Sequence, residues 1–205
     1  MLKNILSGVS AGIMISVGGA VYLACDNRYA GAVLFTVALL SICYKGYALF
    51  TGKAGFIVEK HGKAEVSELL LALLGNLFGT VICGYAIRYA IPTMGEAAKV
   101  LCDAKLTQAL PSTLIRALFC GVLMYIAVSI FREKGSITGI IFCVPVFILA
   151  GFEHSIADMF YFAVSGIVSV QALVFIWAVI IGNAVGAMIL PALNYKGGAK
   201  SGQKS

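Results

Sequence analysis

The stretch GFEHSIADM, residues 151–159, places Glu153, His154 and Asp158 in the middle of a long region that is otherwise uncharged. Ionisable side chains at the centre of a membrane cost roughly 2.5–3.5 kcal/mol each on insertion scales, so they usually face a cavity or a transport pathway. We therefore expect this stretch to interrupt a membrane-spanning helix and to carry the function of the protein. A histidine that merely bonds neighbouring helices is the alternative.

The composition of the 205-residue chain is that of an integral membrane protein, with 60% hydrophobic and 12% charged residues. A spanning helix needs about 20 apolar residues, and uncharged runs of that length recur along the chain. We predict an all-α protein with six spans. They cover residues 4–25, 29–58, 69–87 and 106–131, with two more in 135–195 separated by FAVSGIVS, residues 162–169. Residues 4–25 are expected to stay as a helix, not to be cleaved as a signal peptide.

Two pairs of motifs suggest that the chain contains an inverted repeat. The third span carries GNLFG, residues 75–79, and the sixth carries GNAVG, residues 182–186. The second span is interrupted at LFTGKAG, residues 49–55, and the fifth at residues 151–159, with nearly the same spacing. Chance recurrence is the alternative for the glycine motifs. Three spans in each half, about 1–93 and 106–195, would make the halves enter the membrane in opposite senses.

Broken helices of this kind have a physical use. The amino ends of half-helices carry unpaired N–H groups and a partial positive charge, which favour an anion between them. Irregular backbone at membrane depth is tolerated only where protein or water lines it, so we predict a pore. The glycines of both motifs are expected to let helices approach closely.

The distribution of Lys and Arg predicts the orientation. With the amino terminus in the cytoplasm, most of the basic residues fall inside, among them Lys3, Arg132 and Lys134. Both termini are then cytoplasmic, residues 1–195 form one channel domain, and 196–205 form a flexible basic tail. The formal charge of +6 is explained by topology and anionic lipid headgroups, so we expect no nucleic acid partner.

Nothing in the sequence indicates an enzyme. The two histidines are far apart, and the chain has no HExxH, GxSxG or Walker motif. The six cysteines form no CxxC pair, so we expect neither a metal site nor a disulfide framework, and no cofactor. A scaffold without transport is disfavoured, because paired helix breaks would cost it stability without benefit.

The motifs LFTGK after a second span, GFEHSIADMF in a fifth and GN in a sixth resemble the formate/nitrite transporter family of bacterial anion channels. Within that family the sequence is most similar to the hydrosulfide channels. The resemblance implies an aquaporin-like bundle of six helices with the second and fifth broken. It also implies a homopentamer in the bacterial inner membrane, with one pore per protomer.

The resemblance assigns roles to particular residues. The family's pore residues are a central histidine, a loop threonine, the phenylalanine next to that threonine, an asparagine of the last span, and three apolar constriction residues. They fall on His154, Thr51, Phe50, Asn183, Phe35, Leu39 and Phe147. The family also places a lysine before the fourth span, at Lys105.

Other charged residues are expected to assist the pore. Lys45 and Lys53, together with Lys105, are candidates to attract anions by their local field, although lysines also snorkel without any function. Glu153 is expected to accept hydrogen bonds from loop backbone and, with Asp158, to support the broken helix. A hydroxyl can also cap a half-helix, which is a second possible role for Thr51.

Departures from the family pattern bear on the substrate. Formate and nitrite members usually carry an acidic residue at position 48 and often an asparagine at 121, where this chain has Ala48 and Gly121. EHSIAN is replaced by EHSIAD, which introduces Asp158, and Lys53 follows the loop threonine by two positions. These differences favour hydrosulfide, with formate, nitrite or chloride as alternatives.

Two mechanisms remain open for the predicted central site. A neutral His154 would polarise the anion, whereas a protonated His154 would transfer its proton so that the neutral acid crosses the apolar rings. The second mechanism would make the protein a proton-linked transporter. A neutral-solute channel of similar fold is a remote alternative, because the paired Asn-Pro-Ala motifs of aquaporins are absent.

Overall fold

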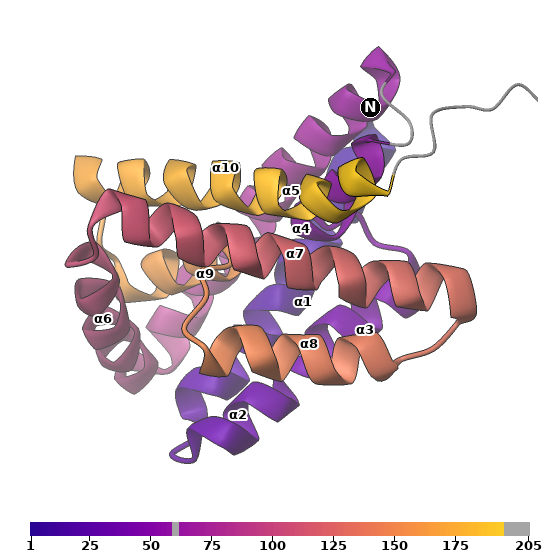
Figure 1. Cartoon of the computed structure of the whole chain (residues 1–205). Coiled ribbons are helices and arrows are strands. Elements are labelled where there is room, and N and C mark those ends of the chain that lie inside the picture. The colour runs from indigo at the N-terminus through magenta and orange to yellow at the C-terminus, as the bar shows by residue number, and fades with distance from the viewer. Residues whose placement is uncertain (59–61, 195–205) are drawn as a thin grey trace, which may run out of the picture.

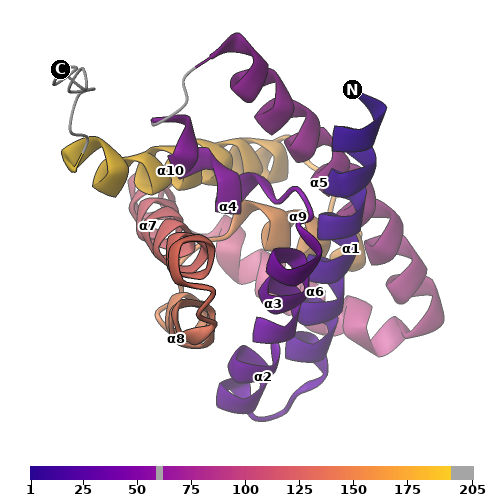
Figure 2. The ribbon, with the colours of Figure 1, turned by 90° about the vertical axis from the view of Figure 1, so that its right-hand side faces the viewer.

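The computed structural model describes residues 1–58 and 62–194, and these residues contain helices and no strand. The predicted tail, 196–205, lies outside the described residues. The elements are, in order, α1 (Leu2–Ala24), α2 (Arg28–Leu34), α3 (Thr36–Lys45), α4 (Phe50–Lys53), the 3-10 helix η1 (Ala54–Ile57), α5 (Lys63–Ala90), α6 (Pro92–Leu106), α7 (Leu110–Lys134), α8 (Thr138–Leu149), α9 (Ser155–Ser165) and α10 (Val170–Leu193). Figure 1 shows the amino terminus and the end of α10 on the side of the molecule opposite α6, and Figure 2 shows them well apart on that side.

The helices agree with six membrane passes. Within the described residues, four single helices, α1, α5, α7 and α10, are long and apolar enough to cross a bilayer. The 18-residue segment Arg28–Lys45, made of α2 and α3, is a fifth candidate. The sixth pass is divided between two shorter apolar helices, α8 and α9. Many large apolar side chains are exposed, including Phe78, Ile82 and Trp177, as expected for a chain surrounded by lipid or by neighbouring subunits.

The two halves of the chain pack in the same way, as an inverted repeat requires. The closest helix pairs are α1 with α5 and α7 with α10, each joining the first and third span of a half. Figure 2 shows α7, α8 and α10 on one side and α1, α3 and α5 on the other, with α9 between them. Glycines permit both contacts. A Cβ at Gly8 would lie 3.0 Å from the Gly75 Cα, and one at Gly186 would lie 2.9 Å from the Leu118 Cα.

A glycine ends the first part of each broken span. Gly46 follows α3 with φ 67°, and Gly151 follows the last turn of α8 with φ 71°. Side chains disfavour this left-handed conformation, so glycine is the residue that stops a helix this way. The next amide then donates to the carbonyl five residues back, at 3.0 Å in the second span and 2.9 Å in the fifth.

These glycines correct the predicted position of both breaks. The second span is interrupted at 46–49 and not at 49–55, because α4 already begins at Phe50. In the fifth span the break covers 150–154, and the remainder of the predicted stretch forms the first turns of α9. Phe50 and Thr51 are therefore helical residues, and the hydroxyl of Thr51 makes no cap at the start of α4.

The polar segment between the halves forms a further helix, α6, which the sequence pattern did not predict. Pro92 begins it, in the first turn where a missing N–H costs nothing. Gly95, Ala98 and Cys102 are its buried residues, and they share one helical face at spacings of three and four. Because α6 packs against α9, its last turn brings Lys105 to the break of the fifth span.

Candidate functional site

An asparagine fixes the break of the fifth span. The Asn183 Oδ1 accepts a hydrogen bond of 2.8 Å from the Ser155 amide, at the amino end of α9. Its Nδ2 donates at 2.8 Å to the Ala117 carbonyl and at 2.8 Å to the Glu153 carbonyl. Asn183 is fully buried, and its side-chain amide forms all three of these hydrogen bonds with backbone groups. It was predicted among the pore residues, but the structure places it behind the break, where it holds the backbone in position.

A second asparagine, Asn76, does the same for the second span. Its Oδ1 accepts from the Phe50 amide at 2.9 Å, and its Nδ2 donates to the Gly8 and Ala48 carbonyls at 2.8 and 2.9 Å. Phe50 thus enters this site through its backbone N–H. Sequence analysis did not identify Asn76 as a site residue. The GN motif occurs in both halves, with Asn76 in the first and Asn183 in the second, and this internal match could have identified it.

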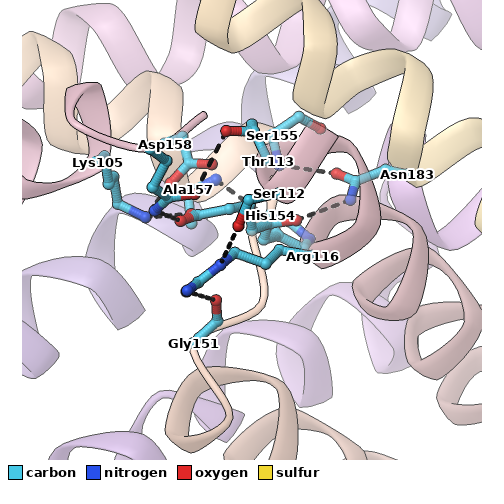
Figure 3. Close-up of polar contacts among 12 residues, drawn as sticks. Lys105, Ser112, Thr113, Arg116, Gly151, His154, Ser155, Ala157, Asp158 and Asn183 are labelled. Atoms are coloured by element: carbon cyan, nitrogen blue, oxygen red, sulfur yellow. Dashed lines mark hydrogen bonds and ion pairs between the residues drawn. The ribbon is translucent and has the colours of Figure 1, made fainter. Parts of the chain in front are cut away.

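The two halves meet at a pair of buried polar side chains. The Thr51 Oγ1, from α4, lies 2.9 Å from the His154 Nε2, at the start of α9. The other ring nitrogen, Nδ1, accepts a hydrogen bond of 3.1 Å from the Ala157 amide (Figure 3). An accepting Nδ1 carries no proton, so the ring is neutral and its Nε2–H donates to Thr51. The hydroxyl hydrogen of Thr51 is then available to another acceptor.

Apolar side chains enclose this pair. The ring of Phe147 stacks on His154 with 5.5 Å between centroids, and it meets Phe35 edge to face at 6.2 Å. Leu39, one helical turn after Phe35, is also buried. Such side chains give a dehydrated ion no hydrogen bonds, so they form a barrier to charge.

Two cavities of about 410 Å³ each lie on opposite sides of the barrier. Cavity 1 is near the end of α3 and the start of α5, and its lining includes Leu39, Leu49, Lys53, Phe56 and Arg132. Cavity 2 is near α6, and its lining includes Phe35, Phe147, Lys105, Glu153, His154 and Asp158. Thr51 lines neither cavity. Because His154 lines cavity 2 and Gly52 and Lys53, next to Thr51, line cavity 1, the Thr51–His154 pair lies between the two cavities.

A charged cluster forms one wall of cavity 2. The Lys105 Nζ contacts the Glu153 Oε2 and lies 2.9 Å from the Asp158 Oδ1. The Gln108 Nε2 donates to the Glu153 Oε1 at 2.6 Å. Burial alone would lower the pKa of Lys105, but Asp158 and then Glu153 raise it by more, so the ammonium stays charged. Figure 3 shows Lys105 and Asp158 together beside the break that contains His154.

This cluster corrects the role predicted for Glu153. Its carboxylate accepts from the side chains Lys105 and Gln108, and not from loop backbone as expected. The backbone of the break is supported by arginine instead, because the Arg116 guanidinium donates to the Gly151 carbonyl at 3.0 Å (Figure 3). Gln108 and Arg116 were missed, since their contacts depend on how α6 and α7 pack against the break.

The remaining lysines are placed differently from one another. Lys53 is exposed and lines cavity 1, where its charge can act on an entering ion. Lys45 is also exposed but lines neither cavity. In the described residues, no group of three or more His, Cys, Asp or Glu side chains is arranged to hold a metal ion.

These features define a class of protein: a multi-pass membrane transport protein with two broken helices and a polar pair between two cavities. The comparison with known families agrees, since the model of the formate/nitrite transporter family matches residues 1–196. The chain belongs to the formate/nitrite transporter family. It is therefore a transport protein and not an enzyme.

Relatives and solved structures support the assignment. The chain is 28% identical over 187 residues to the "Uncharacterized transporter YwcJ" of Bacillus subtilis, covering 80% of this chain and 72% of that one. It is 25% identical to the "Formate-nitrite transporter" of Plasmodium ovale, covering 80% of this chain and 63% of that one. The fold matches a "Pentameric formate channel with formate bound" with TM-score 0.80, 24% identity and 95% of each chain covered. An "FNT family ion channel" matches with TM-score 0.83 and 21% identity, covering 95% of this chain and 89% of that one.

Proposed function

We propose that the protein is a membrane channel for small monovalent anions and that hydrosulfide is its main physiological ion. The observation that carries this proposal is the Thr51–His154 contact of 2.9 Å, which joins the two halves between two cavities. An anion that moves from either cavity into the apolar barrier meets two hydrogen-bond donors at this pair, with Phe35, Phe147 and Leu39 around it. Selectivity then rests on how well two donors replace the lost hydration.

The geometry supports a neutral His154 that polarises the ion. Since Nδ1 is occupied by the Ala157 amide, the ring can take a second proton only by losing that hydrogen bond. The Nε2–H of His154 and the O–H of Thr51 are both donors, and an anion entering from cavity 2 accepts from them in turn. The neutral ring adds no net charge that would hold the ion in place, which is what conduction requires.

The small number of donors favours hydrosulfide over oxyanions. Hydrosulfide presents one soft atom to the site, whereas formate and nitrite each present two oxygen atoms that lose hydration. Gly121 supplies no further donor, and a Cβ there would lie 2.8 Å from the Ala187 amide nitrogen. Formate remains the specific alternative, because one structural neighbour is a channel with formate bound.

Assembly and orientation are part of the proposal. The same structural neighbour is pentameric, and the exposed apolar side chains of this chain are compatible with subunit contacts as well as lipid. The excess of basic residues at the side of the amino terminus supports a cytoplasmic cavity 1 and an outer cavity 2. The expected location is the bacterial inner membrane, with both termini inside.

Flux into proteoliposomes tests the function. Hydrosulfide, formate, nitrite and chloride are compared with the leak of empty liposomes, using wild type, His154→Ala and Thr51→Val. Thr93→Val is the matched control, because Thr93 is an exposed threonine on α6 that lines neither cavity. We expect hydrosulfide flux well above the leak, lowered about tenfold by Thr51→Val through the loss of one donor worth about 1.4 kcal/mol.

The outcomes separate the alternatives. Formate or nitrite flux without hydrosulfide flux would show that the channel is right and the ion wrong. Equal flux in His154→Ala, Thr51→Val and Thr93→Val would refute the assigned site. Absence of flux for every anion would refute the channel.

A further inference from the structure

We infer that Asp158 is the proton donor of cavity 2: it holds a proton there and transfers it to a weak-acid anion, so that the neutral acid crosses the apolar barrier. This inference rests on the proposed anion channel and adds that a proton crosses together with each anion. It starts from the charge balance of the cluster at cavity 2, where two buried carboxyl groups, on Glu153 and Asp158, contact one ammonium group, on Lys105.

One of the two carboxyl groups must be neutral for the cluster to balance. Both contact the same Lys105 Nζ, and both are at most 2% exposed, so water screens their repulsion poorly. When two carboxyl groups share one buried site, one of them retains its proton to a much higher pH than usual. A doubly ionised pair would also repel the anion that the pore admits.

The hydrogen bonds identify Asp158 as the neutral partner. Glu153 receives a donor on each oxygen, Lys105 on Oε2 and Gln108 on Oε1, and donors stabilise the ionised form. Asp158 receives only Lys105, on Oδ1. Its Oδ2 is buried and has no hydrogen-bond partner among the described residues. An ionised Oδ2 would be costly there, whereas a protonated Oδ2–H is a donor that awaits an acceptor.

The other groups near α9 cannot supply this proton near neutral pH. Cys102 of α6, Cys120 of α7, Tyr22 of α1 and Tyr161 of α9 are thiols and phenols, which ordinarily titrate at about 8.5 to 10. The arginines near the site are Arg28 and Arg116, which line cavity 2, and Arg88 of α5, which donates to the Ser165 carbonyl; a guanidinium group does not act as a proton donor of this kind in proteins. Helix α10 has no titratable side chain, and the lysine of α4 lines cavity 1.

His154 is also unsuited to give a proton. Its Nδ1 accepts from the Ala157 amide, so the ring has a single N–H, on Nε2, and losing that would leave an imidazolate. Asp158 lines the same cavity as His154 and lies four residues later, at the first turn of α9. The donor is therefore next to the barrier and on its outer side.

The proposed step is balanced. The proton moves from the Asp158 carboxyl to the sulfur of hydrosulfide or to an oxygen of formate, which gives hydrogen sulfide or formic acid. The carboxylate that remains is held by Lys105, and a proton from the outer water restores the acid. A neutral molecule meets Phe35 and Phe147 without the dehydration cost of an ion. Chloride, whose conjugate acid is strong, gains nothing from this donor.

The experiment follows protons and the anion together. Proteoliposomes with a pH dye inside, and valinomycin with potassium to carry charge, receive an inward gradient of labelled formate or of hydrosulfide, whichever gives the larger protein-dependent flux. Wild type is expected to bring in one proton per anion, with flux that rises as the outer pH falls. In Asp158→Asn the side chain keeps its size and shape but has no carboxyl proton to transfer. The coupled flux of this variant is expected to fall at least about tenfold. Its pH profile is expected to flatten.

Three further variants complete the test. Asp103→Asn is the matched control, since Asp103 is an exposed aspartate on α6 that lines neither cavity 1 nor cavity 2, and we expect no change. Asp158→Glu is expected to restore coupling. Glu153→Gln removes the competing charge beside Asp158, so the half-maximal pH of the flux is expected to shift downward. This variant keeps the test informative if Asp158→Asn fails to elute as a folded oligomer.

The results distinguish the inference from the proposed function. Asp158→Asn with wild-type rate, coupling and pH profile would overturn the inference and leave the anion channel intact, as would an unchanged profile in Glu153→Gln. Wild-type flux of the anion without any proton would also overturn it. Absence of anion flux in wild type would remove the channel and the inference together.

Discussion

Replacing Asn183 by alanine is expected to weaken the break of the fifth span severely. The side chain makes three hydrogen bonds, to the Ser155 amide and the Ala117 and Glu153 carbonyls, each 2.8 Å long. At about 1 kcal/mol each the bonds alone contribute roughly 3 kcal/mol. The loss is larger because Asn183 is fully buried, so water cannot replace it and the backbone groups remain unpaired.

The assay is thermal unfolding of the purified oligomer in detergent, followed by flux in proteoliposomes. A change of 1 kcal/mol shifts the melting temperature by about 2–4 °C in a chain of this size, so we expect Asn183→Ala to melt lower by roughly 6–12 °C. Its flux should fall too, because the Glu153 carbonyl and the start of α9 are no longer fixed. Asn76→Ala should behave alike, since Asn76 makes the corresponding bonds in the other half.

A matched control comes from the same helix. Asn194 also donates to a carbonyl, that of Leu190 at 2.8 Å, but it is exposed at the end of α10. Asn194→Ala is expected to melt within about a degree of wild type. If Asn183→Ala melts as Asn194→Ala does, the view that buried asparagines hold the two breaks is refuted.

Two further predictions concern single positions. Gly46→Ala has open space around its new Cβ, so its cost is the left-handed backbone alone, about 1–2 kcal/mol; a melting temperature unchanged from wild type would contradict the role of Gly46 in ending α3. Lys105→Met leaves Glu153 and Asp158 without their ammonium group, so anion flux from the side of cavity 2 should fall at least about tenfold at neutral pH; flux equal to that of an exposed control, Lys99→Met, would contradict this.

Much of the architecture was predictable because hydrophobic length and internal repetition are visible in a sequence. The number of spans follows from apolar runs, and the repeated GN motif marked the halves. The exact breaks were not predictable from polar residues. They are set by Gly46 and Gly151, and a glycine shows its left-handed backbone only once the chain is folded.

The site was predictable where a residue acts in its own segment and not where it acts across segments. His154 and Thr51 stand in recognisable motifs. The partners of Glu153 come from α6 and the turn after it, within a polar stretch, and its contacts with Lys105 and Gln108 span more than forty residues of chain. Such pairings depend on packing, which no local pattern contains.

The two halves of the chain match at the positions that build the backbone breaks and differ at the positions that carry the polar side chains of the site. Asn76 and Asn183, and Gly46 and Gly151, are matched pairs that build the same backbone twice. Counted from the glycine pair, Leu49 occupies the place of His154, and Ile156 occupies that of Thr51. Each half thus supplies one polar side chain, Thr51 from the first and His154 from the second, and the two meet at 2.9 Å. Symmetry provides the two breaks, and the departure from symmetry places His154 of the break and Asp158 of α9 at cavity 2.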